Sequence, residues 1–332
     1  MAEILLSLTI IGVVAAITLP SLTGNINERT WSTQRKALHT RMVQAVAMMG
    51  NLNGFGTYNS TITEDDNEIL NLTVSEDTAA ETFVTAGLSK VLKLNNVCDN
   101  EHLADCGLAT NISTMGGTQI TLPKTLKELN QFFATDGTWK GDVTAYGYPM
   151  IDTKAAGFET ANGESVAVYY NPRCLDIMQA AGSGQATSST EFPLTLLMCA
   201  NFVFDMNGNK GPNTVGKDIG FMSAVYSSEP QVAMPVLTSN IKPAWKNWRD
   251  GAKYCREQDA RLPSLEEGMA IAINSNLLGL SDEDKIDAYW TNTLVAEFPS
   301  NAWIFWLWNG DLIGNGSNPN KDNSWNVLCV KR

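Results

Sequence analysis

The stretch Glu3–Pro20, EILLSLTIIGVVAAITLP, is an apolar run with one acidic residue at its start and a proline at its end. From Ile4 to Leu22 the chain carries no charge for nineteen residues, which is about the length of a helix that spans a bilayer. A carboxylate at the mouth of such a segment is costly in lipid, so we expect Glu3 to pair with the amino terminus of a neighbouring subunit. The stretch therefore predicts a helix that lies in a membrane before it enters an assembly.

Beyond Pro20, apolar residues recur mostly at three- and four-residue steps. They are Ile26, Trp31, Leu38, Met42, Val46 and Met49, and this spacing predicts an amphipathic helix to about Gly50. Basic residues also lie along this segment, although the formal net charge of the chain is −12. Arg29, Arg35, Lys36 and Arg41 could face acidic neighbours or anionic lipid head groups, or they could simply face solvent.

The first fifty residues resemble the amino-terminal helix of type IV pilins and pseudopilins. Members of this family carry a Glu and a Pro at the spacing of Glu3 and Pro20, and their mature chains begin at a methylated Phe a few residues before the Glu. The Phe is missing from the sequence here, and Met1 stands where family members have mature residues. The resemblance implies that Glu3 and Pro20 serve filament assembly with other pilin subunits. It also implies that the chain resides in the inner membrane before assembly and in an extracellular pilus at the cell surface afterwards. A plain signal anchor is the alternative interpretation.

Length and cysteine content constrain the remaining chain. At 332 residues with 44% hydrophobic content, the chain can bury more than one core, so we expect two globular units behind the helix. Six cysteines without a CxxC pair, beside only two histidines, favour disulfides outside the cytoplasm over a zinc site. Fifteen pairings are possible. Pairing of nearest neighbours in sequence would give Cys98–Cys106, Cys174–Cys199 and Cys255–Cys329.

Residues 51–240 predict a domain of mixed helix and strand, and the resemblance to pilins implies a pilin-like α/β domain with an antiparallel sheet. Val166–Tyr170 and Phe202–Phe204 have the β-branched and aromatic content of strands. The segment Phe204–Phe221, FDMNGNKGPNTVGKDIGF, then places oxygen-bearing side chains in a glycine-rich loop. Such side chains are calcium ligands, and the candidates are Asp205, Asn207, Asn209 and Asp218. The segment also resembles a loop signature of pilin-like proteins, so a purely structural loop is the alternative, and no other cofactor is expected.

Residues 241–332 hold seven of the nine tryptophans, which predicts a separate domain. The pattern Ser264–Glu267 predicts a helix with a capping box. Several short motifs, including Ala252–Cys255, Arg261–Ser264, Tyr289–Thr293 and Val327–Val330, follow in the order of a C-type-lectin-like domain. More narrowly, they resemble the variant found in formylglycine-generating-enzyme relatives and in the variable proteins of diversity-generating retroelements. This resemblance implies the fold, but it does not by itself imply sugar binding or catalysis.

The chemistry of this third block favours recognition. It lacks the Glu-Pro-Asn and Trp-Asn-Asp motifs of calcium-dependent lectins, and it contains no histidine. In the run Trp303–Trp308, WIFWLW, alternation should place Ile304, Trp306 and Trp308 on the face opposite to Trp303, Phe305 and Leu307. Three large apolar side chains on a solvent face would mark an interaction site. A strand that is buried on both faces is the alternative.

The loop Asp311–Trp325, which follows this run, is rich in Asn, Ser, Gly and Asp, which are adaptable contact residues in binding loops. The resemblance to retroelement variable proteins implies a ligand-binding face whose residues could be diversified. An ordinary surface turn is the alternative. The positions that would vary are Asn292, Leu294, Ala296, Ile304, Trp306, Trp308, Asp311, Ile313, Asn315, Ser317, Asn320, Asp322 and Asn323.

Together these patterns predict an α+β fold: a long hydrophobic amino-terminal helix (residues 1–50), an α/β pilin domain (51–240) and a C-type-lectin-like domain (241–332). The predicted function is that of a filament subunit, minor or at the tip, which displays the last domain to a protein or glycan ligand. Catalysis and nucleic-acid binding are not expected. A pseudopilin that docks a secreted partner is the main alternative, and an oxidase that uses Cys255 and Cys329 as thiols is a remote one.

Overall fold

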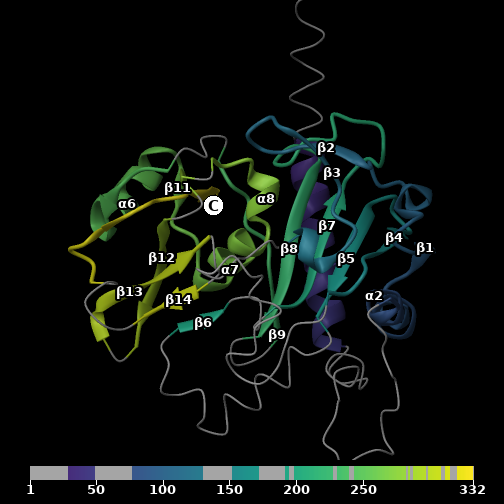
Figure 1. Ribbon diagram of the computed structural model, residues 1–332, viewed down its shortest axis with the longest axis horizontal. Helices are drawn as coiled ribbons and strands as arrows, with labels where there is room; N and C mark the ends of the chain where they lie inside the picture. The colour runs from purple at the N-terminus through teal and green to yellow at the C-terminus, as the bar shows by residue number, and fades with distance from the viewer. Residues whose placement is uncertain are drawn as a thin grey trace, which may run out of the picture.

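A computed structural model describes most of the chain (Figure 1). The described residues are 29–48, 77–129, 152–171, 191–193, 198–226, 230–238, 243–281, 283–284, 287–296, 298–307, 311–314 and 320–331.

The centre of the molecule is a six-stranded sheet in the order β1-β4-β5-β7-β8-β9, and every neighbouring pair is antiparallel. The strands are β1 (Leu94–Cys98), β4 (Ala156–Thr160), β5 (Ser165–Tyr170), β7 (Met198–Asp205), β8 (Ile219–Tyr226) and β9 (Pro230–Ala233). Every residue of β5 and β7 is buried. A strand that is covered on both faces does not need alternating polar and apolar side chains. This explains the continuous apolar runs in β5 and β7.

One face of the sheet is covered by the helix over residues 29–48 (Figure 1). Leu38, Met42 and Val46 on this helix are buried against Val166, Val168 and the phenyl rings of β7. Their spacing of four residues places them on one helix face, as the sequence predicts. A short helical segment shares this cluster and runs through α2 (Ala79–Thr82), the π-turn η2 (Phe83–Gly87) and η3 (Leu88–Lys90). The Phe83 ring stacks on that of Tyr170, with centroids 4.3 Å apart.

The opposite face of the sheet is covered by the carboxy-terminal block. Helix α7 (Leu265–Ile273) and the short α8 (Ser275–Leu278) share a core with Ala167, Tyr169 and Val203 of the sheet. Helix α7 begins at Ser264, whose hydroxyl accepts a hydrogen bond from the Glu267 backbone, and the predicted capping box is confirmed. An added Cβ at Gly268 would lie 2.8 Å from the Phe305 ring, so glycine is needed where α7 meets the last sheet.

A buried polar group fixes how α7 sits on the central sheet. The side-chain amides of Asn201 on β7 and Asn274 at the end of α7 bond to each other in both directions, at 2.9 and 2.8 Å. The Ser223 hydroxyl of β8 donates to the Asn201 oxygen at 2.6 Å. All three side chains are completely buried. Because a buried amide without a partner is costly, this network favours one docking position over others.

The carboxy-terminal block is built around a second sheet in the order β12-β13-β14-β6. Its strands are β12 (Ala288–Val295), β13 (Phe298–Trp306), β14 (Asp311–Ile313) and β6 (Glu191–Pro193). Helix α6 (Trp248–Glu257) and four two-residue strands flank this sheet. The short strands form two pairs: β10 (Lys246–Asn247) with β15 (Ser324–Trp325), and β11 (Ala260–Arg261) with β16 (Val330–Lys331). Strand β6 comes from the middle of the chain, so the second sheet contains residues from two of the predicted domains.

The described disulfides follow the predicted pairing. Cys98–Cys106 closes a loop that contains η4 (Leu103–Cys106), and Cys255–Cys329 joins α6 to the chain end. Both pairings are confirmed. Cys199 is also in a disulfide, while its predicted partner Cys174 lies outside the described residues. The long Cys255–Cys329 loop, with a sequence separation of 74, contributes about 4 kcal/mol of stability in the chain-entropy treatment.

The fold-class prediction was right in its α+β class and antiparallel sheet but wrong in its first element. Among the described residues, no helix is both long and apolar enough to cross a membrane. The helix over residues 29–48 has an exposed face that carries Arg29 and Lys36. The predicted apolar helix, with Glu3 and Pro20, lies outside the described residues.

The predicted basic stripe also needs correction. Arg35 is buried and donates to the Gly216 carbonyl oxygen at 3.4 Å, whereas Arg41 forms a 2.6 Å ion pair with the buried Glu164. Two of the four basic side chains of the stripe therefore have their partners within the chain itself. The predicted division at residues 50 and 240 stays a prediction, although the second and third blocks share the core around α7.

Replacing Asn274 with alanine should lower the free energy of unfolding by about 1–3 kcal/mol, because Asn201 would lose its buried amide partner. Urea denaturation of the full chain measures this change. Asn276→Ala is the matched control, since that half-buried amide makes a 3.4 Å contact with the Glu128 carbonyl oxygen at the surface. Equal losses in the two variants would contradict a specific role for the Asn201–Asn274 pair.

Candidate functional site

The carboxy-terminal block carries a surface that runs from the tip of the β12–β13 hairpin to β10 and β15. At the tip, Leu294 and Phe298 are 47% and 46% exposed. The segment 320–325 connects the tip to the far end of this surface: Lys321 donates its backbone N–H to the Ser300 carbonyl oxygen at 3.1 Å, and Trp325 pairs with Lys246 in the β10–β15 ladder. We call this surface the display face.

Three tryptophans meet at the β10–β15 end of the display face. The Trp325 ring lies 5.8 Å from Trp245 and 5.9 Å from Trp306, and both contacts are edge-to-face. Trp245 is 59% exposed, and the other two rings are half-buried. Nearby, the Lys321 ammonium sits 5.1 Å from the centre of the Trp248 ring. The cluster therefore offers rigid aromatic surface beside polar and cationic groups, which is the composition of binding hot spots.

The structure places the predicted variable residues in four groups. Asn292, Leu294, Ala296, Asp322 and Asn323 are exposed, and Asn320 and Trp306 are half-buried. Asp311 and Ile313 lie in β14, which pairs with β13 and β6. Trp308, Asn315 and Ser317 lie outside the described residues. The remaining position is Ile304.

Ile304 does not belong to the display face, and its assignment is corrected. It is fully buried in a cluster with Trp290, Val327 and the Cys255–Cys329 sulfurs, while its neighbour Phe305 is fully buried in the core around α7. The middle of β13 is thus covered on both faces, which was the alternative interpretation of the WIFWLW run. The structure separates Ile304 from Trp306, which packs at the margin of the same cluster and reaches solvent.

Sequence reasoning missed two members of the aromatic cluster, Trp245 and Trp325. They are eighty residues apart in the chain, and the two-residue ladder between β10 and β15 brings them together. The high tryptophan content of the block was the available signal. It could not distinguish these two rings from Trp290, which is completely buried and donates its indole N–H to the Lys246 carbonyl oxygen at 3.0 Å.

The predicted cation ligands lie in the loop between β7 and β8, and the structure brings three of the four together. Asp205 ends β7 and is 1% exposed, and Asp218 immediately precedes β8 and is fully buried. Asn207 follows Asp205 and donates its backbone N–H to the Asp205 carboxylate at 3.1 Å. Burial raises the pKa of Asp205 to about 7, and the nearby Asp218 charge adds to this rise. Asn209 lies exposed on the outer turn of the loop.

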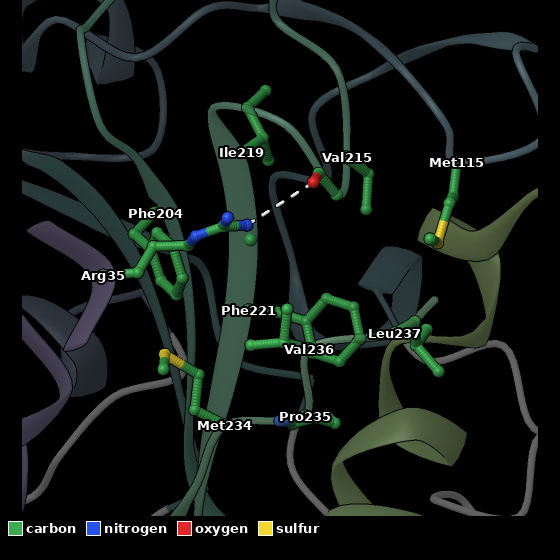
Figure 2. Close-up of a pocket in the computed structure, with 12 residues that line it drawn as sticks. Arg35, Met115, Phe204, Val215, Ile219, Phe221, Met234, Pro235, Val236 and Leu237 are labelled. Carbon is green, nitrogen blue, oxygen red and sulfur yellow. Dashed lines mark hydrogen bonds between the residues drawn. The ribbon is translucent and has the colours of Figure 1, made fainter. Parts of the chain in front are cut away.

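Two other hollows offer weaker sites. A cavity of about 20 Å³ lies beside Arg35 and Phe221 (Figure 2), which is room for a single water molecule at most. An open groove of about 540 Å³ separates the hairpin of β2 (Asn111–Ser113) and β3 (Gln119–Thr121) from α8. Its charged groups are already engaged: Lys124 pairs with Glu101 at 2.7 Å, and the Glu128 carboxylate, from α3 (Leu126–Leu129), accepts the Lys124 backbone N–H.

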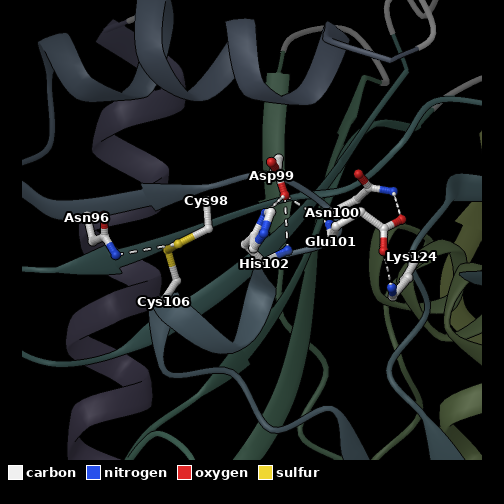
Figure 3. Close-up of polar contacts among 8 residues, drawn as sticks. All are labelled: Asn96, Cys98, Asp99, Asn100, Glu101, His102, Cys106 and Lys124. Carbon is white, nitrogen blue, oxygen red and sulfur yellow. Dashed lines mark hydrogen bonds and ion pairs between the residues drawn. A yellow bond between two sulfur atoms is a disulfide. The ribbon is translucent and has the colours of Figure 1, made fainter.

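His102 has a carboxylate partner that the sequence did not reveal. Its Nδ1 lies 2.7 Å from the Asp99 carboxylate, beside the Cys98–Cys106 bridge (Figure 3). This contact raises the pKa of His102 and lowers that of Asp99. Both groups are exposed, and the two sulfurs of the same loop are bonded to each other. We interpret the pair as a surface ion pair that orders the loop. The other histidine, His39, contacts the Val232 carbonyl oxygen at 2.8 Å.

Comparison of the chain with protein-family models, curated proteins and solved structures finds no match. Functional inference for this chain therefore rests on its residues and their geometry.

Replacing Ile304 with alanine should cost about 2–5 kcal/mol of stability, because it opens a cavity in a closed cluster. Trp245→Ala should change stability by no more than about 0.5 kcal/mol, because the side chain is mostly exposed. Chemical denaturation of the two variants measures both values. A large loss in Trp245→Ala with none in Ile304→Ala would reverse our assignment of the display face.

Proposed function

We propose that this chain is a subunit of a surface filament of the type IV pilin kind, and that it presents the display face to a protein or glycan ligand. The resemblance of the first fifty residues to pilins supports the filament part of the proposal. The helix over residues 29–48 lies on the sheet face opposite to α7, so this helix and the display block cover different sides of the sheet. Contacts with other subunits would use the segment before residue 29.

The observation that carries the ligand part is the exposed aromatic cluster of Trp245, Trp306 and Trp325. Aromatic rings at a surface bury a large area at small entropic cost when a partner binds. The half-buried Asn320 and the exposed Asp322 and Asn323 lie on the segment between this cluster and the hairpin tip, and their amide and carboxylate groups can supply hydrogen bonds. This composition suits recognition of a ligand, and the proposal includes no catalytic step.

Trp245→Ala and Trp306→Ala should each weaken ligand binding at least tenfold, because each removes aromatic area from the cluster. The measurement applies the purified full chain to arrays of printed glycans and of extracellular proteins. Lys217→Ala is the control, since that exposed residue lies on the β7–β8 loop away from the second sheet. Unchanged binding in both tryptophan variants, with normal folding, would exclude the cluster as the ligand site.

A pseudopilin of a secretion machine is the second candidate, because the same display face could dock a secreted protein. The two candidates differ in the effect of deleting the gene. Loss of secretion with adhesion intact would favour the pseudopilin, and loss of adhesion with secretion intact would favour the displayed receptor.

We further propose that a retroelement diversifies the display face. Deep sequencing of the gene's 3′ end in a clonal population should then show adenine-directed substitutions in the codons of residues that reach solvent, such as Asn292, Trp306 and Asn320. The codon of Ile304 should stay constant, because this side chain is enclosed in a core cluster. An invariant 3′ end would exclude diversification and leave a fixed binding specificity.

A further inference from the structure

The end of strand β7 and the turn that follows it contain two buried oxygen atoms that accept no hydrogen bond. They are Oδ2 of Asp205 and Oδ1 of Asn207, and each is inaccessible to solvent in the structure of the described residues. Leaving a buried carboxylate or amide oxygen without a hydrogen-bond partner is energetically costly. An ion or a water molecule that binds at this position would satisfy both atoms.

The orientation of Asn207 is fixed by its other side-chain atom. Its amide nitrogen donates a 2.7 Å hydrogen bond to the Gly211 carbonyl oxygen, which only the nitrogen can do. Exchanging the amide nitrogen and oxygen of Asn207 would place its oxygen against the Gly211 carbonyl oxygen, where neither atom could donate a hydrogen bond. The free oxygen thus has a defined direction, set by the loop and not by a choice between equivalent rotamers.

Further oxygen atoms surround this position. Ser165 lies directly opposite Asp205 in the ladder of β5 and β7, so both side chains project from the same face of the sheet. Asp218 lies beside this position, because its backbone carbonyl oxygen accepts the Met206 N–H at 3.0 Å. The two carboxylate oxygens of Asp218 accept backbone N–H bonds from Asn213 and Thr214 at 2.8 and 2.9 Å, which hold the carboxylate in place.

We propose that this loop binds one calcium ion through Asp205 Oδ2 and Asn207 Oδ1, with the negative charge of Asp218 beside it. Calcium takes six to eight oxygen ligands in flexible geometry, and the remaining positions can be filled by water and backbone carbonyl oxygens. Carboxylate and amide oxygens without nitrogen or sulfur ligands select a hard cation over zinc or copper. This site lies on the central sheet and is independent of the ligand that the display face binds.

The loop joins three parts of the molecule, so the ion would stabilise more than the loop. Gly216 accepts the Arg35 hydrogen bond from the helix over residues 29–48. Ser113 of β2 bonds to both Asn213 and Val215, and the β2–β3 hairpin in turn bonds to α8 through Met115 and Gly116. A ligand that binds only the folded loop raises the stability of the whole chain by mass action.

The test is a calorimetric titration of the chelator-treated full chain with calcium chloride alone, together with the melting temperature with and without calcium. We expect one ion per chain, tighter binding of calcium than of magnesium, and a rise in melting temperature. Asp205→Asn should weaken calcium binding at least tenfold. Asp322→Asn, which removes an exposed carboxylate elsewhere, should leave the affinity unchanged.

Asn207→Ala provides a second variant and should also weaken binding at least tenfold. If Asp205→Asn does not fold, the wild-type titration and Asn207→Ala decide the question. Absence of calcium binding by the wild-type chain would overturn the proposal, as would equal affinity for magnesium or unchanged affinity in Asn207→Ala. Because none of these readouts involves the display-face ligand, failure here is separate from failure of the proposed function.

Discussion

Burial of the central sheet on both faces is the constraint on which the other elements depend. Strands β5 and β7 direct alternate side chains into two separate clusters: Val166 and Val168 face the helix over residues 29–48, and Ala167 faces α7. Neither cover can be removed without exposing one of these rows to water. The carboxy-terminal block is therefore part of the structural core, although its sequence has the character of an added domain. The Asn201–Asn274 hydrogen bonds fix the position of α7 on β7, which apolar burial alone would not define.

Sequence patterns predicted the elements whose signals are local. The strands around Val166 and Phe202, the amphipathic helix and the Ser264 capping box each depend on residues close together in the chain, and all are present. The patterns could not show how the elements pack, because packing depends on long-range contacts. Strand β6 illustrates this limit, since its partner β14 lies more than a hundred residues later. In a strand that is buried on both faces, polar and apolar residues do not alternate, so its sequence does not show which element packs on each face.

The display face was predicted only in part, because packing decides which of its residues reach solvent. Asp322, Asn323 and the tip residue Leu294 are exposed, as predicted, whereas Asn320 is half-buried. Ile304 was misassigned because the alternation of β13 was assumed to separate core from solvent, whereas here it separates two cores. In the loop after β7, the sequence indicated the ligand types correctly. It could not show that Asn209 turns outward while Asn207 points its oxygen inward, because that difference arises from the hydrogen bond to Gly211.

The arrangement of β13 also limits where a binding specificity can change. A substitution at Phe305 or Ile304 disturbs one of two closed clusters, and Trp290 is tied by its indole N–H to the Lys246 backbone. Trp245, Leu294 and residues 322–323 lie outside these clusters, so the free energy of folding depends little on their identity. Half-buried Trp306 lies between these two classes, since it packs on Trp325 and still reaches solvent. A surface that must vary while the scaffold stays folded therefore has its positions at the hairpin tip, along segment 320–325 and around the exposed rings.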